Sequence, residues 1–218
     1  MAPTQRAVVT ALLDECGRTY ADEAGIRLRD TPQPLYRLLV LADLLSTRIR
    51  ADIAMAAARE LSEAGMRDPA SMARATWQQR VDALGRGGYR RYDESTATRL
   101  GEGAELAARE YGGDLRRMHE RAGDDVRALR EELTRFPGVG PTGADIFLRE
   151  VQGVWPHIAP YLDAKALDGA RRLGLPDDPA KLRRAAPDAP PEVLAAALVR
   201  VALGKDAADS VRERAGSA

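Results

Sequence analysis

The sequence predicts an all-α fold, and three observations support this prediction. Alanine, arginine and leucine dominate the composition, which favours helices. Aromatic residues make up only 5% of the chain and β-branched residues are sparse, so strand-forming segments are rare. Apolar residues recur with helical spacing in segments that end at short breaks of Gly, Pro and Asp, and no segment shows a convincing strand alternation.

Each expected helix lies between two such breaks and carries apolar residues at the helical period. The tail after Gly204 is polar and is expected to fray. In chain order, the expected helices span residues 5–24, 34–45, 49–64, 69–74, 78–84, 93–111, 114–122, 124–134, 142–151, 164–173, 179–184 and 191–202.

Length and charge limit the class of protein. At 218 residues the chain can bury a core as one large domain or two small ones. Its 33 basic and 33 acidic residues balance, which argues against indiscriminate nucleic-acid binding but is compatible with a local basic face. No apolar run reaches the roughly 20 residues of a membrane helix, and residues 1–18 lack a signal-peptide pattern. We therefore expect a cytoplasmic protein with no membrane partner.

The composition also disfavours disulfide and metal chemistry. Cys16 is the single cysteine of the sequence, so the chain forms neither an internal disulfide nor a four-cysteine iron–sulfur cluster. The only histidines are His119 and His157, and a zinc site is therefore not expected. We predict no metal site.

The most informative segment is residues 133–148, where a Pro-Gly-Val-Gly hairpin separates two expected helices. Its glycines, Gly138 and Gly140, permit a tight backbone and leave no side chain in the way of a phosphate. The second helix begins near Pro141 or Thr142, where free N–H groups form an anion site and a proline costs no hydrogen bond. The segment therefore predicts a phosphate-binding turn.

Two other interpretations of this segment compete. Residues 138–143 satisfy the G-x-G-x-x-G pattern of dinucleotide-binding folds. That motif follows a strand, whereas residues 126–134 have a helical pattern, so the context disfavours a nucleotide cofactor. A plain structural turn between two helices is the other alternative.

Four segments together resemble the helix-hairpin-helix DNA glycosylases, the superfamily of endonuclease III and the adenine glycosylases. Residues 136–144 resemble the family hairpin, and residues 39–48 resemble an early helix that ends in a Leu-Leu-Ser-Ala-Gln-type sequence. Residues 87–92 resemble a Gly-Leu-Tyr-Asn-type turn, and residues 155–163 resemble the stretch that leads to a catalytic aspartate. The resemblance covers roughly residues 32–175.

The resemblance implies two helical subdomains with a DNA-binding cleft between them. Residues 31–155 would form a helical barrel with the helix-hairpin-helix at 126–151, and residues 1–30 would join 156–218 in the second subdomain. The implied protein is a nucleoid-associated monomer whose partner is double-stranded DNA with a damaged, mispaired or abasic site. It would require no cofactor, would lack the iron–sulfur cluster of many relatives, and would have a monovalent cation as an optional ligand at the hairpin. The identity of the recognised base stays open.

The resemblance also implies two carboxylates with catalytic roles. The Asp163 carboxylate would stabilise positive charge on the sugar as the N-glycosidic bond breaks, and it would also cap the helix that begins at Ala164. The interval from Ala159 to Asp163 is longer than in endonuclease III. Asp43 takes the position of the catalytic glutamate of adenine glycosylases, in an otherwise apolar helix. It is expected either to line the base pocket or to pair with an arginine.

The positions of the lysines determine which type of reaction the resemblance implies. Thr142 takes the position of the lysine with which lyase members of the family form a Schiff base, and no lysine precedes Lys165. Lys165 is a weaker substitute, since it lies on another side of its helix turn. The resemblance therefore implies a monofunctional DNA glycosylase. Two functions compete with it: a non-catalytic protein that binds distorted or abasic DNA, and a helical protein-interaction module.

The remaining predictions concern DNA contacts. Arg48 takes the position of a family glutamine that fills the gap left by an extruded base; a solvated helix-end arginine is the alternative. The turn of Tyr89, Arg90 and Arg91 suits base stacking and phosphate contact, or else is a surface turn with one buried tyrosine. Arg149 would reach the DNA backbone or face solvent. The predicted DNA-binding residues are Gly138, Val139, Gly140, Thr142, Gly143, Arg48, Tyr89, Arg90, Arg91 and Arg149.

Overall fold

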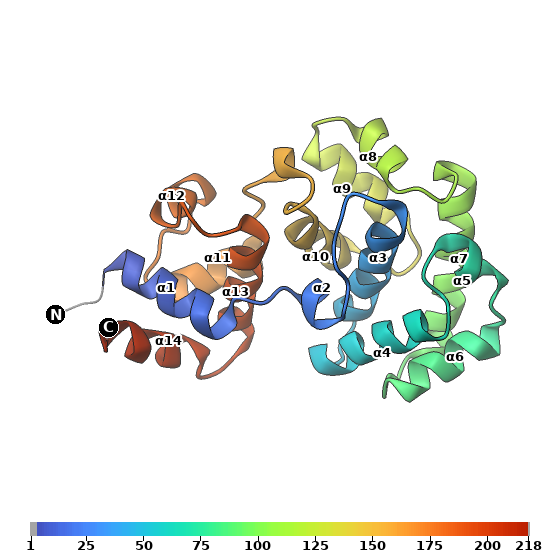
Figure 1. Cartoon of the computed structure of the whole chain (residues 1–218), viewed down its shortest axis with the longest axis horizontal. Helices are drawn as coiled ribbons and strands as arrows, with labels where there is room; N and C mark the ends of the chain where they lie inside the picture. Colours follow the sequence, from blue (N-terminus) through green and yellow to red (C-terminus); the bar gives the residue numbers. More distant parts are fainter. Residues whose placement is uncertain (1–3, 218) are drawn as a thin grey trace. The chain divides into compact units, whose positions relative to one another are not determined.

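The computed structural model describes residues 4–217, which form helices and no strand, so the all-α prediction is confirmed (Figure 1). Within this range no helix is both long enough and apolar enough to cross a bilayer. The elements are α1 (Gln5–Cys16), α2 (Tyr20–Glu23), α3 (Pro32–Ser46), α4 (Ala51–Glu63), α5 (Pro69–Arg74), α6 (Trp77–Arg86), α7 (Asp93–Tyr111), α8 (Arg116–Ala122), α9 (Val126–Thr134), α10 (Pro141–Val151), a 3-10 turn (Pro156–Ile158), α11 (Ala164–Arg172), α12 (Pro179–Ala185), α13 (Pro191–Leu203) and α14 (Ala207–Gly216).

The chain forms two compact units. Unit 2 is Ala21–Leu148, and unit 1 combines the described residues up to Tyr20 with those from Arg149 onward. The boundaries between the units therefore lie earlier in the chain than the expected divisions after residues 30 and 155. Hydrogen bonds give the reason at the first division, because Arg37 and Arg59 donate to the carbonyls of Gly25 and Glu23 and hold this segment to α3 and α4.

Unit 2 is organised around α3. This helix is apolar on most of its surface and buries Leu35, Leu38, Leu41 and Leu44 completely, as expected of a helix in the middle of a core. It packs on α4, α4 packs on α6, and α5 and α6 both pack on α7. The single charged side chain among the buried residues of α3 is Asp43.

Local sequence explains where the short helices of unit 2 begin. Asp68 and Ser71 form a capping box at the start of α5, and Thr76 and Gln79 form another at the start of α6. Each box satisfies backbone N–H groups that a helix start otherwise leaves unpaired. Local sequence therefore defines the first turns of these short helices.

Unit 1 is built around α13, whose residues from Leu194 to Val199 are buried without interruption. α11 packs closely on it, because a Cβ at Gly169 would collide with the backbone of Leu198. α1 and α14 lie side by side and also pack on α13 (Figure 1). Both ends of the described chain thus belong to the same unit.

Two expectations about unit 1 are wrong. The helix expected over residues 5–24 ends at Cys16 and resumes as α2, and a Cβ at Gly17 would collide with the carbonyl of Leu13. The tail after Gly204 does not fray but forms α14, because Ala208, Val211 and Ala215 are buried in the packing of this helix. Three small apolar residues at helical spacing were a weak signal in a polar segment.

Candidate nucleic-acid interface

The predicted hairpin connects α9 to α10 in unit 2. The Val139 N–H donates to the carbonyl of Phe136 over 3.0 Å, and the Gly140 N–H donates to the carbonyl of Gly138 over 3.2 Å. Gly138 has a φ of 88°, a conformation that favours glycine. The side chains of Phe136 and Val139 are buried and fix the turn to the core, whereas Gly138 is exposed.

The exposed start of α10 follows directly. Its first hydrogen bond is from the Ala144 N–H to the Gly140 carbonyl, so the amides of Thr142 and Gly143 have no acceptor within the helix. Thr142 is exposed, whereas Gly143 is buried against Val139 and α3. Of the predicted hairpin residues, Val139 and Gly143 therefore serve packing, and Gly138 and Thr142 face outward.

Asp43 lies directly beneath the hairpin. A Cβ at Gly138 would come within 2.9 Å of the Asp43 carboxyl carbon and would also collide with Arg99. Arg99 Nη2 donates to Asp43 Oδ1 over 3.4 Å and to Thr96 Oγ1 over 3.0 Å. The Asp43 side chain is only 4% exposed, and that of Arg99 is 26% exposed. The expected pairing of Asp43 with an arginine is therefore found.

Beside Asp43 the structure has no space for a base, and the other expectation, that this residue lines a base pocket, stays a prediction. The cavity beside it has a volume of about 20 Å³, room for about one water molecule and far too small for a nucleobase. Apolar side chains such as Tyr36, Leu39 and Phe136 form much of its wall. Burial raises the pKa of Asp43 to about 6 against the opposing charge of Arg99.

Tyr89 is fully buried, so the expectation that it stacks on a DNA base is wrong and the buried-tyrosine alternative is correct. Its hydroxyl lies 2.6 Å from Thr47 Oγ1. Arg90 and Arg91, which follow Tyr89, are exposed, and Arg48, which follows Thr47, is exposed as well. Among the described residues, none of these three arginines has a carboxylate partner, which leaves them available to an anion.

Asp163 lies in unit 1, at the start of α11. Its Oδ1 accepts a hydrogen bond from the Ala166 N–H over 3.0 Å, so the predicted capping role is confirmed. Its Oδ2 pairs with Arg149 Nη1 at 2.5 Å, and the side chains of Arg149 and Asp163 are 7% and 11% exposed. Arg149 therefore does not face solvent, and that alternative is wrong; its expected contact with a DNA backbone stays a prediction.

Gln152 is a residue of this region that the sequence did not single out. Its buried side-chain amide donates to the carbonyls of Arg149 and Tyr161, and its oxygen accepts from the Tyr161 N–H. These bonds hold the segment before Asp163 against the end of α10. They lie in the part of unit 1 that begins at Arg149, earlier than the expected division after residue 155. A glutamine in a polar turn gives no sequence signal of such a role.

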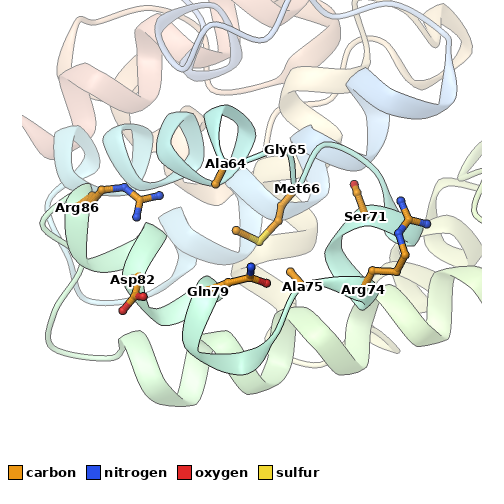
Figure 2. Close-up of a pocket in the computed structure, with 9 residues that line it drawn as sticks. All are labelled: Ala64, Gly65, Met66, Ser71, Arg74, Ala75, Gln79, Asp82 and Arg86. Atoms are coloured by element: carbon orange, nitrogen blue, oxygen red, sulfur yellow. The ribbon is translucent and has the colours of Figure 1, made fainter.

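The two residues that bear on lyase chemistry are both exposed: Thr142 at the start of α10 and Lys165 in the first turn of α11. Unit 2 also has a polar pocket of about 360 Å³ outside the predicted site (Figure 2). Several of its polar groups are already engaged, since Arg86 pairs with Glu60, Asp82 accepts from Gln78, and Ser71 and Gln79 complete the capping boxes. Within the described residues, no cluster of three metal-ligating side chains occurs.

No protein-family model matches the chain, and no curated protein matches it. Among solved structures, the chain is similar to the protein of a trapped endonuclease III–DNA covalent intermediate, an estranged-adenine complex. The two chains share 18% sequence identity with a TM-score of 0.47, and the match covers 90% of this chain and 85% of that chain.

Proposed function

We propose that this protein binds double-stranded DNA through the hairpin of unit 2 and hydrolyses the N-glycosidic bond of an extruded base without cleaving the strand. The observation that carries the proposal is the turn of residues 136–140, whose buried Phe136 and Val139 hold Gly138 and the start of α10 outward. Amides without helical acceptors and the local helix dipole favour a phosphate at this point. The reaction requires no cofactor.

Asp163 is the proposed catalytic carboxylate. As the glycosidic bond breaks, positive charge develops on the sugar, and a fixed carboxylate lowers the energy of that state. In this chain Arg149 and the Ala166 N–H fix the orientation of the carboxylate. Neither Thr142 nor any other residue of the hairpin can form a Schiff base, so the proposed product is an intact strand with an abasic site.

The test is base release from a panel of duplexes that each hold one lesion: an alkylated purine, a deaminated base, an oxidised pyrimidine or an 8-oxoguanine mispair. Strand cleavage is scored before and after alkali. We expect release that requires alkali to nick the strand, and a loss of about 100-fold or more in Asp163→Asn. The matched control is Asp168→Asn, an aspartate of the same helix that pairs with Arg171 and Arg172, and it should retain activity. Release that persists in Asp163→Asn would contradict the assigned role.

A second candidate function is favoured by one specific observation. Both carboxylate oxygens of Asp163 already have partners, and the side chain is 11% exposed. A protein that binds distorted or abasic DNA without removing a base would have no need of a free carboxylate. Tight binding to abasic duplexes by the wild-type protein, with no release from any member of the panel, would establish this second function instead.

A further inference from the structure

A chain of side-chain hydrogen bonds runs beneath the exposed face of unit 2. The Thr47 hydroxyl donates to the carbonyl of Leu44 over 2.8 Å, which uses its only proton. Tyr89 must therefore donate across the 2.6 Å contact to Thr47. Within α7, Thr96 Oγ1 accepts from Arg99 Nη2 over 3.0 Å.

These bonds join two separate segments of unit 2. Thr47 belongs to the loop between α3 and α4, and Tyr89 to the turn between α6 and α7. Arg99 lies on α7 beneath Gly138 of the hairpin. Burial raises the pKa of Tyr89, which keeps its phenol protonated and able to donate. The bond from Tyr89 to Thr47 is the direct link between these two segments.

The residues next to this link carry unpaired positive charge. Arg48 follows Thr47, and Arg90 and Arg91 follow Tyr89; all three side chains are exposed. None of the three forms an ion pair with a carboxylate among the described residues, and the nearby Asp52 pairs with Arg50 instead. The Arg91 guanidinium stacks on the ring of Tyr92 at 5.2 Å.

The start of α10 lies beside the same loop. A Cβ at Gly143 would lie 3.6 Å from the Cβ of Ser46, the last residue of α3. Arg48 is two residues further along the chain. The start of α10, where Thr142 is exposed, and the charge of the Arg48 loop thus occupy neighbouring positions within unit 2, which matches the repeated negative charge of a nucleic-acid backbone.

We infer that Tyr89 is a positioning residue whose hydroxyl, through Thr47, holds Arg48, Arg90 and Arg91 together as one phosphate-binding surface beside the hairpin. This inference rests on the proposed DNA binding and assigns Tyr89 and Thr47 a role in it. Two exposed segments that moved independently would lose more conformational entropy on binding. The buried hydrogen bond holds both segments before the DNA arrives.

The experiment measures the affinity of the full chain for a short unmodified duplex by fluorescence anisotropy, between about 50 and 200 mM salt. Each arginine that contacts a phosphate contributes about 0.9 to the slope of log affinity against log salt. We expect Tyr89→Phe and Thr47→Val to make this slope shallower by about 1 to 2 and to weaken binding several-fold. In a variant with Arg48, Arg90 and Arg91 all changed to alanine, Tyr89→Phe should have no further effect on the slope.

A matched control separates positioning from general stability. Tyr111 is also a buried tyrosine of unit 2, and its hydroxyl bonds to Glu132 rather than to a loop that carries an unpaired arginine. Tyr111→Phe should lower the thermal midpoint about as much as Tyr89→Phe but should leave the salt slope unchanged. Arg74→Ala removes an exposed arginine elsewhere in unit 2 and should also leave the slope unchanged.

The outcomes distinguish this inference from the proposed function. If the wild-type protein shows no salt-dependent affinity for duplex DNA, the proposed function and the inference both fail. If the wild-type protein binds and the triple arginine variant loses slope, but Tyr89→Phe and Thr47→Val do not, DNA binding stands and the positioning role is overturned. The same applies if Tyr111→Phe lowers the slope as much as Tyr89→Phe does.

Discussion

Asp43 in unit 2 and Asp163 in unit 1 are buried to a similar extent, but their carboxylate oxygens differ in how well they are paired. Each pairs with one arginine, but Asp163 has a close partner for each oxygen, Arg149 and the Ala166 N–H. Asp43 meets Arg99 at 3.4 Å through one oxygen, and within the described chain its Oδ2 and Arg99 Nε are buried without partners. The contrast shows that an arginine partner alone does not compensate for burial.

The energetic consequences of the two pairs therefore have opposite signs. The Asp163 pair is part of the structure of unit 1, since it joins the end of α10 to the start of α11. The Asp43 pair lies under an exposed turn and leaves polar atoms unsatisfied, which costs free energy of folding. Removing a partner from the first pair should be harmful, and neutralising the second carboxylate should be favourable.

The largest expected effect is from Arg149→Met. It leaves the Asp163 carboxylate nearly buried without its counter-charge and should lower the free energy of unfolding by about 4 kcal/mol, as measured by urea denaturation. The double variant Arg149→Met with Asp163→Asn should recover a large part of that loss, because the uncompensated charge is gone. A single variant as stable as the wild type would show that the pair is not structurally important.

A smaller effect, of opposite sign, is expected at Asp43. Its pKa is about 6 in the folded protein against 3.8 as the ordinary value, so protonation favours folding. The associated stability is fully present below about pH 4 and is lost as the pH rises through 6, a change of about 3 kcal/mol. Asp43→Asn should remove this pH dependence in denaturation curves between pH 4 and 7 and should stabilise the protein at pH 7. Asp145→Asn, in the Arg130–Asp145 pair, is the control and should keep the dependence.

The smallest of the three effects concerns the turn above Asp43. Gly138→Ala places a methyl group against Asp43 and Arg99 at a φ of 88°, and should cost about 2 kcal/mol in thermal denaturation. Gly113→Ala is the matched control, since Gly113 has a φ of 79° and open space around it. It should cost about half as much. If Gly138→Ala and Gly113→Ala cost the same stability, a methyl group at position 138 does not collide with the Asp43–Arg99 pair.

The success of the helix predictions and the failure of several site predictions have different physical causes. Helices such as α5 and α7 start and end where local signals place them, and α7 was expected over its exact range. Local signals do not report burial. Tyr89, Arg90 and Arg91 are adjacent in sequence, yet Tyr89 is buried and the two arginines are exposed. A polar hydroxyl can be buried only where a partner such as Thr47 meets it.

The sequence by itself determined the all-α class, the Pro-Gly-Val-Gly turn before α10, the cap at Asp163 and the absence of a lysine from the hairpin. These features depend on residues within a few positions of one another, so propensity, turn chemistry and capping decide them. The tertiary structure alone decided that Arg149 pairs with Asp163, that Arg99 pairs with Asp43, and that Tyr89 donates to Thr47. Those partners are 14, 56 and 42 positions apart, and only the packing of helices brings them together.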